Sequence, residues 1–298
     1  MRRKFIGVLN GAIAAASYGT NPLFALPMYN GGIGVNSVLF YRYAFAVLIY
    51  FLWLKFFKKT SLKISKQELP PLFILGLLFS LSSLTLFEAF KYIEVGIACT
   101  ILFIYPVLVA VIMALFFHEK ITKTVIFSIL LTFCGIMLLY KGNSASGLNL
   151  YGVSIVFASA LLYAIYIVGV RTIKTIKHIK IDKLSFYVML FGLLVYVFNL
   201  KGCTELQIIK EPYLWLNAIA LALFPTIISL ETLSVSIKLI GSTTTAILGA
   251  LEPLTAIFFG VVVFHEQLTV RIGIGVMLIL AGVFLIVTRN TIRKKRSS

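Results

Sequence analysis

The sequence predicts an all-α integral membrane protein with ten transmembrane helices in two inverted five-helix repeats. Three observations support this prediction: long apolar runs recur along the whole chain, the second half repeats the first, and most basic residues fall on one side of the predicted spans. Hydrophobic residues make up 60% of the chain and charged residues only 12%, whereas soluble domains have about 25% charged residues. This composition excludes an ordinary soluble protein.

Apolar runs of about 20 residues are long enough to cross a bilayer as helices. In chain order they predict spans at 5–26, 37–57, 71–90, 94–117, 123–140, 150–170, 184–200, 213–237, 242–264 and 270–288. The connections are too short for a soluble nucleotide-binding domain, and the chain has no G-x-x-x-x-G-K-[ST] phosphate loop. We therefore expect neither an ATP-driven pump nor a cofactor.

The two halves of the chain are related by an internal repeat. Residues 117–122 read Phe-His-Glu-Lys-Ile-Thr, and residues 264–269, which lie 147 positions later, read Phe-His-Glu-Gln-Leu-Thr. The sixth run repeats the first at an offset of 145. Because five spans per half is an odd number, the second half inserts upside down, as in many secondary transporters. The predicted repeats are residues 1–141 and 150–288, followed by a basic tail at 289–298.

The distribution of positive charge orients the predicted spans. With the N-terminus in the cytoplasm, cytoplasmic segments hold 21 of the 27 Lys and Arg residues, and such a bias sets the orientation of membrane helices. Both termini are therefore expected in the cytoplasm. The net charge of +17 is explained by this bias, so we expect the lipid bilayer and a small-molecule substrate as partners and no nucleic acid.

Two segments resemble a known family. Residues 102–122, which contain Tyr-Pro followed by Ala-Leu-Phe-Phe-His-Glu-Lys-Ile-Thr, resemble the fourth helix of EamA-type transporters, of the drug/metabolite transporter superfamily. Residues 251–269, which begin Leu-Glu-Pro-Leu-Thr-Ala, resemble the ninth helix, and 134–139 and 281–286 resemble the ends of the fifth and tenth. The resemblance implies a ten-helix bundle with a central cavity lined mainly by helices 1, 3, 4, 6, 8 and 9.

The repeat breaks down at charged positions. Tyr105 stands opposite Glu252, and Arg42 has no basic counterpart in the seventh span. Glu252 lies near the middle of its span and Glu231 well inside the eighth, where an acidic side chain costs about 2.5–3.5 kcal/mol on insertion scales unless it faces a cavity or a partner. Both are candidates for substrate binding or proton coupling. The competing interpretations are local packing for Glu252, and an ion pair or hydrogen bond to a helix neighbour for Glu231.

Arg42 and Glu88 are expected at equal depth near the outer face. A salt bridge between them would be a structural clasp or an extracellular gate, and a structural role is favoured over substrate contact because both side chains could also reach water there.

Polar and aromatic residues of the first, fourth and sixth spans are candidates for lining a substrate cavity, since such cavities are mostly apolar with a few polar groups. These are Tyr18, Asn21, Tyr105 and Tyr163. Each is equally typical of packing in a chain with 25 Phe and 14 Tyr. Proline removes a helix hydrogen bond, so bends are expected at Pro22, Pro106, Pro225 and Pro253.

Catalytic and metal sites are not expected. The His-Glu pairs at 118–119 and 265–266 would lie on opposite faces, about 30 Å apart. A membrane enzyme is disfavoured because no His, Cys or Ser–carboxylate cluster falls at one depth, and a scaffold is disfavoured because four internal charged residues are costly unless used.

The sequence therefore predicts a secondary transporter that works by alternating access, most simply an exporter of amino acids or related compounds, with proton coupling as a low-priority hypothesis. Export rests on the family resemblance alone. Uptake or exchange of a nucleotide-like or sugar metabolite is the alternative. A bacterial inner-membrane location is expected, and a homodimer is left open.

Overall fold

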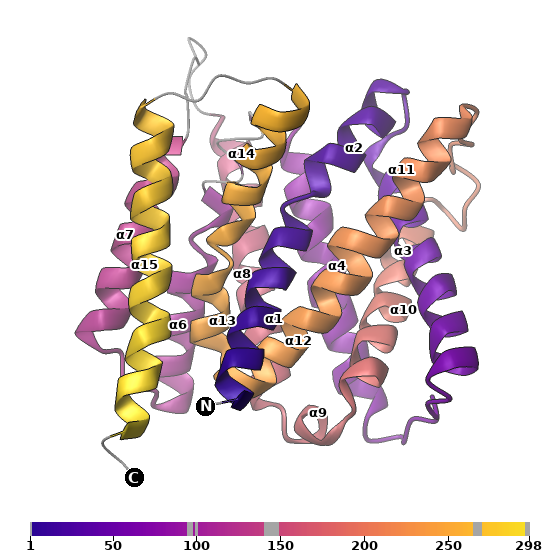
Figure 1. Cartoon of the computed structure of the whole chain (residues 1–298). Helices are drawn as coiled ribbons and strands as arrows, with labels where there is room; N and C mark the ends of the chain where they lie inside the picture. The colour runs from indigo at the N-terminus through magenta and orange to yellow at the C-terminus, as the bar shows by residue number, and fades with distance from the viewer. Residues whose placement is uncertain (1, 94–97, 99–100, 140–148, 265–269, 296–298) are drawn as a thin grey trace.

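The computed structural model describes residues 2–93, 98, 101–139, 149–264 and 270–295, and these form helices without any strand (Figure 1). In the first half, the helices are α1 Arg2–Tyr18, α2 Asn21–Asn30, α3 Val35–Leu52, the π-helix η1 Trp53–Phe57, α4 Leu69–Ala89, α6 Tyr105–Phe117 and α7 Lys123–Leu139. In the second half, they are α8 Leu150–Thr172, α9 Lys174–His178, α10 Ile181–Asn199, α11 Pro212–Ala222, the π-helix η2 Leu223–Ile228, α12 Ser229–Ile240, α13 Ser242–Leu248, α14 Leu251–Phe264 and α15 Val270–Lys295.

Several of these helices are long and apolar enough to cross a membrane. By length and composition they are Val35–Phe57, Leu69–Ala89, Leu150–Thr172, Ile181–Asn199 and Pro212–Ile240, and shorter apolar helices cover Tyr105–Phe117, Lys123–Leu138 and Gly273–Leu285. Large apolar side chains, such as Leu115, Phe198 and Met277, are exposed on the outside of the bundle. An apolar exterior is what a bilayer requires, so the chain is a multi-pass membrane protein.

Some of the predicted runs are interrupted rather than continuous. The run 5–26 is two helices, which are separated at Gly19 and Thr20, and the run 242–264 is two helices separated at Gly249 and Ala250. The eighth run extends to Ile240 and contains a π-helix at its middle. Prolines explain much of this interruption, because a residue without a backbone N–H cannot donate the hydrogen bond to the preceding turn of the helix.

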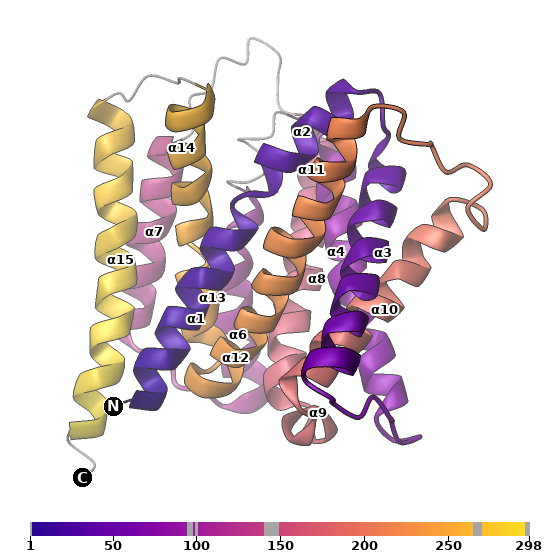
Figure 2. The ribbon, with the colours of Figure 1, turned by 45° about the vertical axis from the view of Figure 1, so that its right-hand side comes forward.

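The first described turn of α1 and the last of α15 lie at one end of the bundle, here named the lower face; the opposite end is the upper face (Figure 1). Helices α7 and α15 lie side by side at one edge of the bundle, and α3 and α10 lie at the other (Figure 2). Between these edges α1 packs against α12, and α4 packs against α8.

Two pairs of close contacts follow the sequence repeat. A Cβ on Gly135 of α7 would meet the backbone oxygen of Gly275 at 2.7 Å, and a Cβ on Gly282 of α15 would meet that of Ser128 at 2.8 Å. Gly135 matches Gly282 and Ser128 matches Gly275 at the 147-residue offset. Each glycine thus allows the same backbone approach from the opposite partner, so the two helices make a two-fold symmetric contact.

The second pair of contacts joins the first span of each half to the third span of the other. A Cβ on Gly7 of α1 would meet Ile240 at 2.5 Å, and a Cβ on Gly152 of α8 would meet Ile93 at 2.8 Å. Ile93 and Ile240 are also related by the 147-residue offset. Two independent contacts therefore place the halves in equivalent, interlocked positions around the centre of the molecule.

Candidate functional site

The centre of the bundle is where three helix ends or breaks meet: the α1–α2 break, the α13–α14 break and the start of α6. At Gly19, between α1 and α2, a Cβ would lie 2.4 Å from the backbone oxygen of Glu252. At Gly249, between α13 and α14, a Cβ would lie 1.6 Å from Oη of Tyr105. Neither space admits a methyl group, so both glycines are required for the approach of these segments.

The predicted tyrosines of α6 and α8 lie together at this centre. The rings of Tyr105 and Tyr163 have centroids 4.9 Å apart in an edge-to-face arrangement, and Tyr166 stacks parallel to Tyr163 at 6.3 Å. Tyr105 and Tyr163 are within electrostatic interaction range of both Tyr18 and Glu252. Tyr18, Tyr105, Tyr163 and Glu252 therefore form one cluster, here called the central site.

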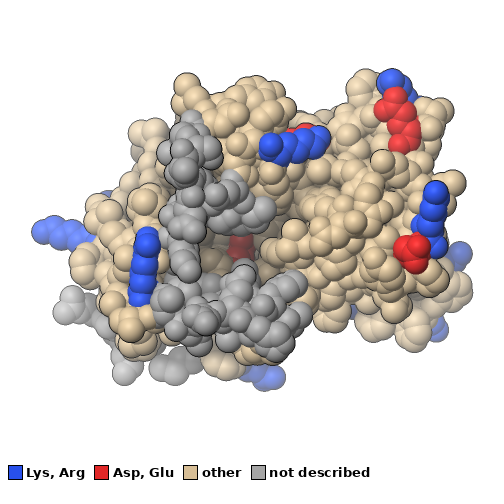
Figure 3. Space-filling model, turned by 90° about the horizontal axis from the view of Figure 1, so that it is seen from above, with Lys and Arg blue, Asp and Glu red and all other residues tan. Residues whose placement is uncertain are grey.

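Glu252 is the acidic group of the central site. It lies in the first turn of α14 and is partly exposed, and no described Lys or Arg forms an ion pair with it. Seen from the upper face, the molecule is hollowed near its middle, and an acidic side chain lies at the floor of the hollow (Figure 3). The helix N-terminus favours a negative charge there, so the ionised form of the Glu252 carboxyl group would attract a cationic ligand.

Asn21 and Pro22 begin α2, directly after the break at Gly19 and Thr20. Asn21 is buried, and its side-chain oxygen Oδ1 has no hydrogen-bond partner in the described part of the chain. The other predicted bend positions lie in corresponding places: Pro106 and Pro253 in the first turns of α6 and α14, and Pro225 inside η2.

Arg42 does not pair with Glu88. It is fully buried, and its guanidinium donates from Nε to Oγ1 of Thr226 at 2.6 Å and from Nη2 to the carbonyl oxygen of Pro225 at 2.9 Å. The same guanidinium lies 5.7 Å from the centroid of the Tyr18 ring, at the edge of the central site. Arg42 therefore uses a hydroxyl and a carbonyl oxygen of η2 in place of a carboxylate.

Glu88 pairs with its neighbour instead. Its carboxylate lies 2.6 Å from Nζ of Lys91, and both side chains are partly exposed near the end of α4. The predicted clasp between Arg42 and Glu88 is therefore absent from the described structure, and Arg42 instead joins α3 to η2 of the second half.

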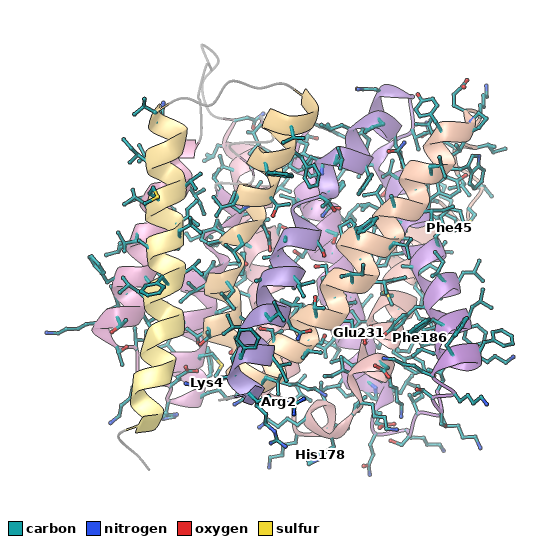
Figure 4. All side chains as sticks on the ribbon, in the orientation of Figure 1. Arg2, Lys4, Phe45, His178, Phe186 and Glu231 are labelled. Atoms are coloured by element: carbon teal, nitrogen blue, oxygen red, sulfur yellow. The ribbon has the colours of Figure 1, made fainter. Side chains whose placement is uncertain are left out.

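Glu231 has polar partners from other elements rather than from its own helix. Its carboxylate accepts a hydrogen bond from Oη of Tyr50 at 2.7 Å and lies 3.3 Å from Nζ of Lys58, which also pairs with Asp182 at 2.9 Å. Partial burial disfavours the Lys58 ammonium, but the two carboxylates outweigh it and raise its pKa. Figure 4 shows Glu231 on α12, well above His178 and Arg2 at the lower face. The charge of Glu231 is thus balanced by Lys58, and Glu231 does not belong to the central site.

Sequence reasoning missed several residues at the centre. Tyr166 and Phe79 extend the aromatic cluster, with ring centroids 5.1 Å apart, and α12 and α13 supply buried Ser and Thr residues. The run of hydroxyl residues at 242–245 was a usable signal in the sequence, but hydroxyls are also common in helix packing. Among the described residues no group of three His, Cys, Asp or Glu could hold a metal ion; residues 265 and 266 lie outside that set.

Comparisons with known proteins agree with this architecture. The model of the EamA-like transporter family matches residues 5–141 and 150–288. An uncharacterized transporter of Archaeoglobus fulgidus is 24% identical over 230 residues, which cover 76% of this chain and 81% of that protein. A solved protein crystal structure has the same fold, with a TM-score of 0.80 at 17% identity over 94% of this chain and 95% of that one. Because the family model covers both repeats, the chain belongs to the EamA-like transporter family.

Proposed function

We propose that this protein is a secondary transporter that exports amino acids or related small metabolites by alternating access. In this proposal ten spans form two inverted five-helix repeats, and the halves rock about the central site. The observation that carries the proposal is the position of Glu252, at the meeting point of three helix ends or breaks and beside the tyrosine cluster.

The chemistry of the central site supports a substrate with an ammonium group. A carboxylate attracts a cation directly, and tyrosine rings attract cations through their faces, an interaction worth about 0.5–2 kcal/mol per contact. Tyr105 and Tyr163 lie in contact with each other and interact electrostatically with Glu252 and Tyr18. A neutral sugar would gain nothing from this carboxylate beyond a hydrogen bond, so the site favours an amine over the nucleotide-like or sugar alternative.

Arg42 supports the narrower choice of an amino acid. Its buried guanidinium lies 5.7 Å from the centroid of the Tyr18 ring, and its Nη1 has no hydrogen-bond partner among the described residues. An amino acid carries an ammonium and a carboxylate a few bonds apart, so it complements a site with a carboxylate on one side and positive potential on the other.

Orientation and coupling complete the proposal. In this proposal the lower face is cytoplasmic in a bacterial inner membrane, as the basic residues predict, and the central site opens toward the upper face in the described state. Glu252 exchanges a proton for the substrate's ammonium group during the cycle, which couples export to the proton gradient.

The test is flux through the purified protein in liposomes. A mixture of radiolabelled standard amino acids is loaded inside, and efflux is compared with liposomes that lack the protein and with liposomes loaded with a labelled hexose. Efflux of one or more amino acids above the protein-free rate supports the proposal. Hexose efflux without amino acid efflux would replace the substrate class, and no flux of either would remove the support for these two classes.

A further inference from the structure

The short helix α13 closes the bundle beneath the central site. All seven of its residues, Ser242–Leu248, are buried, and it packs against α1, α6, α8 and α12. It lies in the lower half of the bundle, below α14 (Figure 1). The hollow is on the upper face (Figure 3), so α13 occupies the space between the central site and the opposite side.

Both ends of α13 are interruptions of the helix. At its start Gly241 has φ +91°, a conformation that glycine adopts readily and other residues avoid, and nothing lies within 4 Å of the position of its Cβ. At its end Gly249 and Ala250 separate α13 from α14. A segment between two such joints can move as a unit, because a few residues at its ends absorb the change in backbone angles.

The composition of α13 is unexpected for a permanent seal. Its first four residues are Ser242, Thr243, Thr244 and Thr245, and the hydroxyls of the first two have no hydrogen-bond partner in the described structure. Thr245, by contrast, donates to the backbone oxygen of Gly241 and lies 2.9 Å from the hydroxyl of Ser236 on α12. A buried hydroxyl without a hydrogen-bond partner destabilises the fold, and a water molecule that reached it would supply the missing hydrogen bond.

The repeat shows that these hydroxyls are not inherited from the common fold. At the offset of 147, residues 242–245 correspond to 95–98, which read Val-Gly-Ile-Ala. The same place in the other half is therefore apolar in sequence. A run of hydroxyls at this place in one half alone indicates a role specific to the lower side of the molecule.

We propose that the hydroxyl-bearing turn of α13 lines the lower half of the transport pathway and that displacement of α13 opens the central site to the lower face. This inference rests on the proposed transport function and adds the segment that moves. Water reaches Ser242 and Thr243 in the lower-open state, and the hydroxyls replace part of the hydration shell of a polar solute that passes them.

The test measures the accessibility of single cysteines. Cys99, Cys134 and Cys203 are replaced by Ser, and Thr243→Cys is compared with Phe127→Cys, whose side chain is exposed on the outside of α7. A charged, membrane-impermeant methanethiosulfonate is added to one face at a time. Because minor states are often populated at about 0.1–10%, we expect Thr243→Cys to be labelled slowly from the lower face, yet about tenfold faster than Phe127→Cys. No labelling is expected from the upper face.

Two further measurements separate this inference from the proposed function. Amino acid efflux by the Cys-free protein reports on function alone, so labelling of Thr243→Cys from the lower face without efflux would support the pathway and reject the substrate class. Efflux together with resistance of Thr243→Cys to labelling from both faces, or labelling from the upper face, would overturn the pathway. Thr243→Val, which keeps the shape and removes the hydroxyl, should lower efflux while a Thr232→Val control on α12 does not.

Discussion

The starts of α6 and α14 occupy the same place in the two repeats but carry different chemistry. Tyr105 precedes Pro106 and Glu252 precedes Pro253, and each pair lies in the first turn of a helix that begins inside the bundle. The backbone interruption is therefore common to both halves, whereas the acidic group belongs to one. This difference indicates that the helix breaks are a feature shared by the two repeats. The chemistry of the central site depends on residues that differ between them.

The largest effect is expected from a methyl group added at Gly249, where the α13–α14 break contacts Tyr105 at the start of α6. Gly249→Ala would place a Cβ 1.6 Å from Oη of Tyr105, and overpacking of this kind costs about 1–3 kcal/mol. We expect efflux to be lost and the melting temperature to fall. Adding Tyr105→Phe removes the clashing oxygen and should restore part of both.

The matched control for that change is Gly273→Ala in α15, where nothing lies within 4 Å of the Cβ position. Replacing a helix glycine by alanine there should be neutral or stabilising by up to about 1 kcal/mol. Wild-type efflux in Gly249→Ala would show that the contact between α6 and the α13–α14 break is not part of the site.

A smaller effect is expected from the phenol of Tyr105 alone. Tyr105→Phe keeps the ring contact with Tyr163 and removes one hydrogen-bonding group, which is worth about 0.5–1.5 kcal/mol. Efflux at low substrate concentration should therefore fall by roughly 2- to 10-fold. The same change at Tyr196, which donates to the carbonyl of Ser80 away from the site, should affect stability more than efflux; the reverse order would contradict the site's position.

The next comparison concerns Arg42 and Glu88. Arg42→Ala leaves the Pro225 carbonyl without its donor and should destabilise the protein by about 1–3 kcal/mol, whereas Glu88→Ala breaks a partly exposed pair worth about 0–1 kcal/mol. Melting temperatures of the single and double variants in detergent test this. Because the two residues form no hydrogen bond or ion pair with each other, their effects on stability should add within about 0.5 kcal/mol. A larger coupling would support the predicted salt bridge between Arg42 and Glu88.

The smallest effect is expected from an acid outside the membrane. Oε2 of Glu68 accepts a hydrogen bond from the Ser65 backbone N–H at 2.7 Å and lies 2.9 Å from Nζ of Lys183, and these partners lower its pKa. A lowered pKa stabilises the fold above the unfolded pKa of about 4.3, and this contribution is lost as the pH falls.

Glu68→Gln should therefore lower the stability by about 0.5 kcal/mol at pH 7, since the pair lies at the surface and is partly exposed. The difference from the wild type should shrink on acidification, which unfolding in detergent at several pH values would measure. A difference that grows as the pH falls would mean that the Glu68 carboxylate is not the stabilised form.

The sequence predicted the helices of this fold better than their contacts. Apolar runs and prolines are local signals, so the interruptions near Pro22 and Pro253 were anticipated. The partners of Arg42 were not, because backbone oxygens near Pro225 become acceptors only after the π-helix forms, and a sequence names no carbonyl. The ion pair of Glu231 with Lys58 joins residues far apart in the chain, and only the packing of α3 beside the second half brings them together.

The central claim is that Glu252, and not Glu231, carries the chemistry of transport. The most direct measurement compares Glu252→Gln and Glu231→Gln in liposomes, with amino acid flux followed with and without an imposed pH gradient. An amide nearly preserves the shape of the carboxyl group but neither holds a negative charge nor exchanges a proton.

We expect Glu252→Gln to lose gradient-driven accumulation while Glu231→Gln, whose carboxylate is held by Tyr50 and Lys58, retains it at a reduced rate. Wild-type gradient-driven accumulation by Glu252→Gln would contradict the account. Should both variants keep it, neither residue carries the proton, and facilitated diffusion would be the better description.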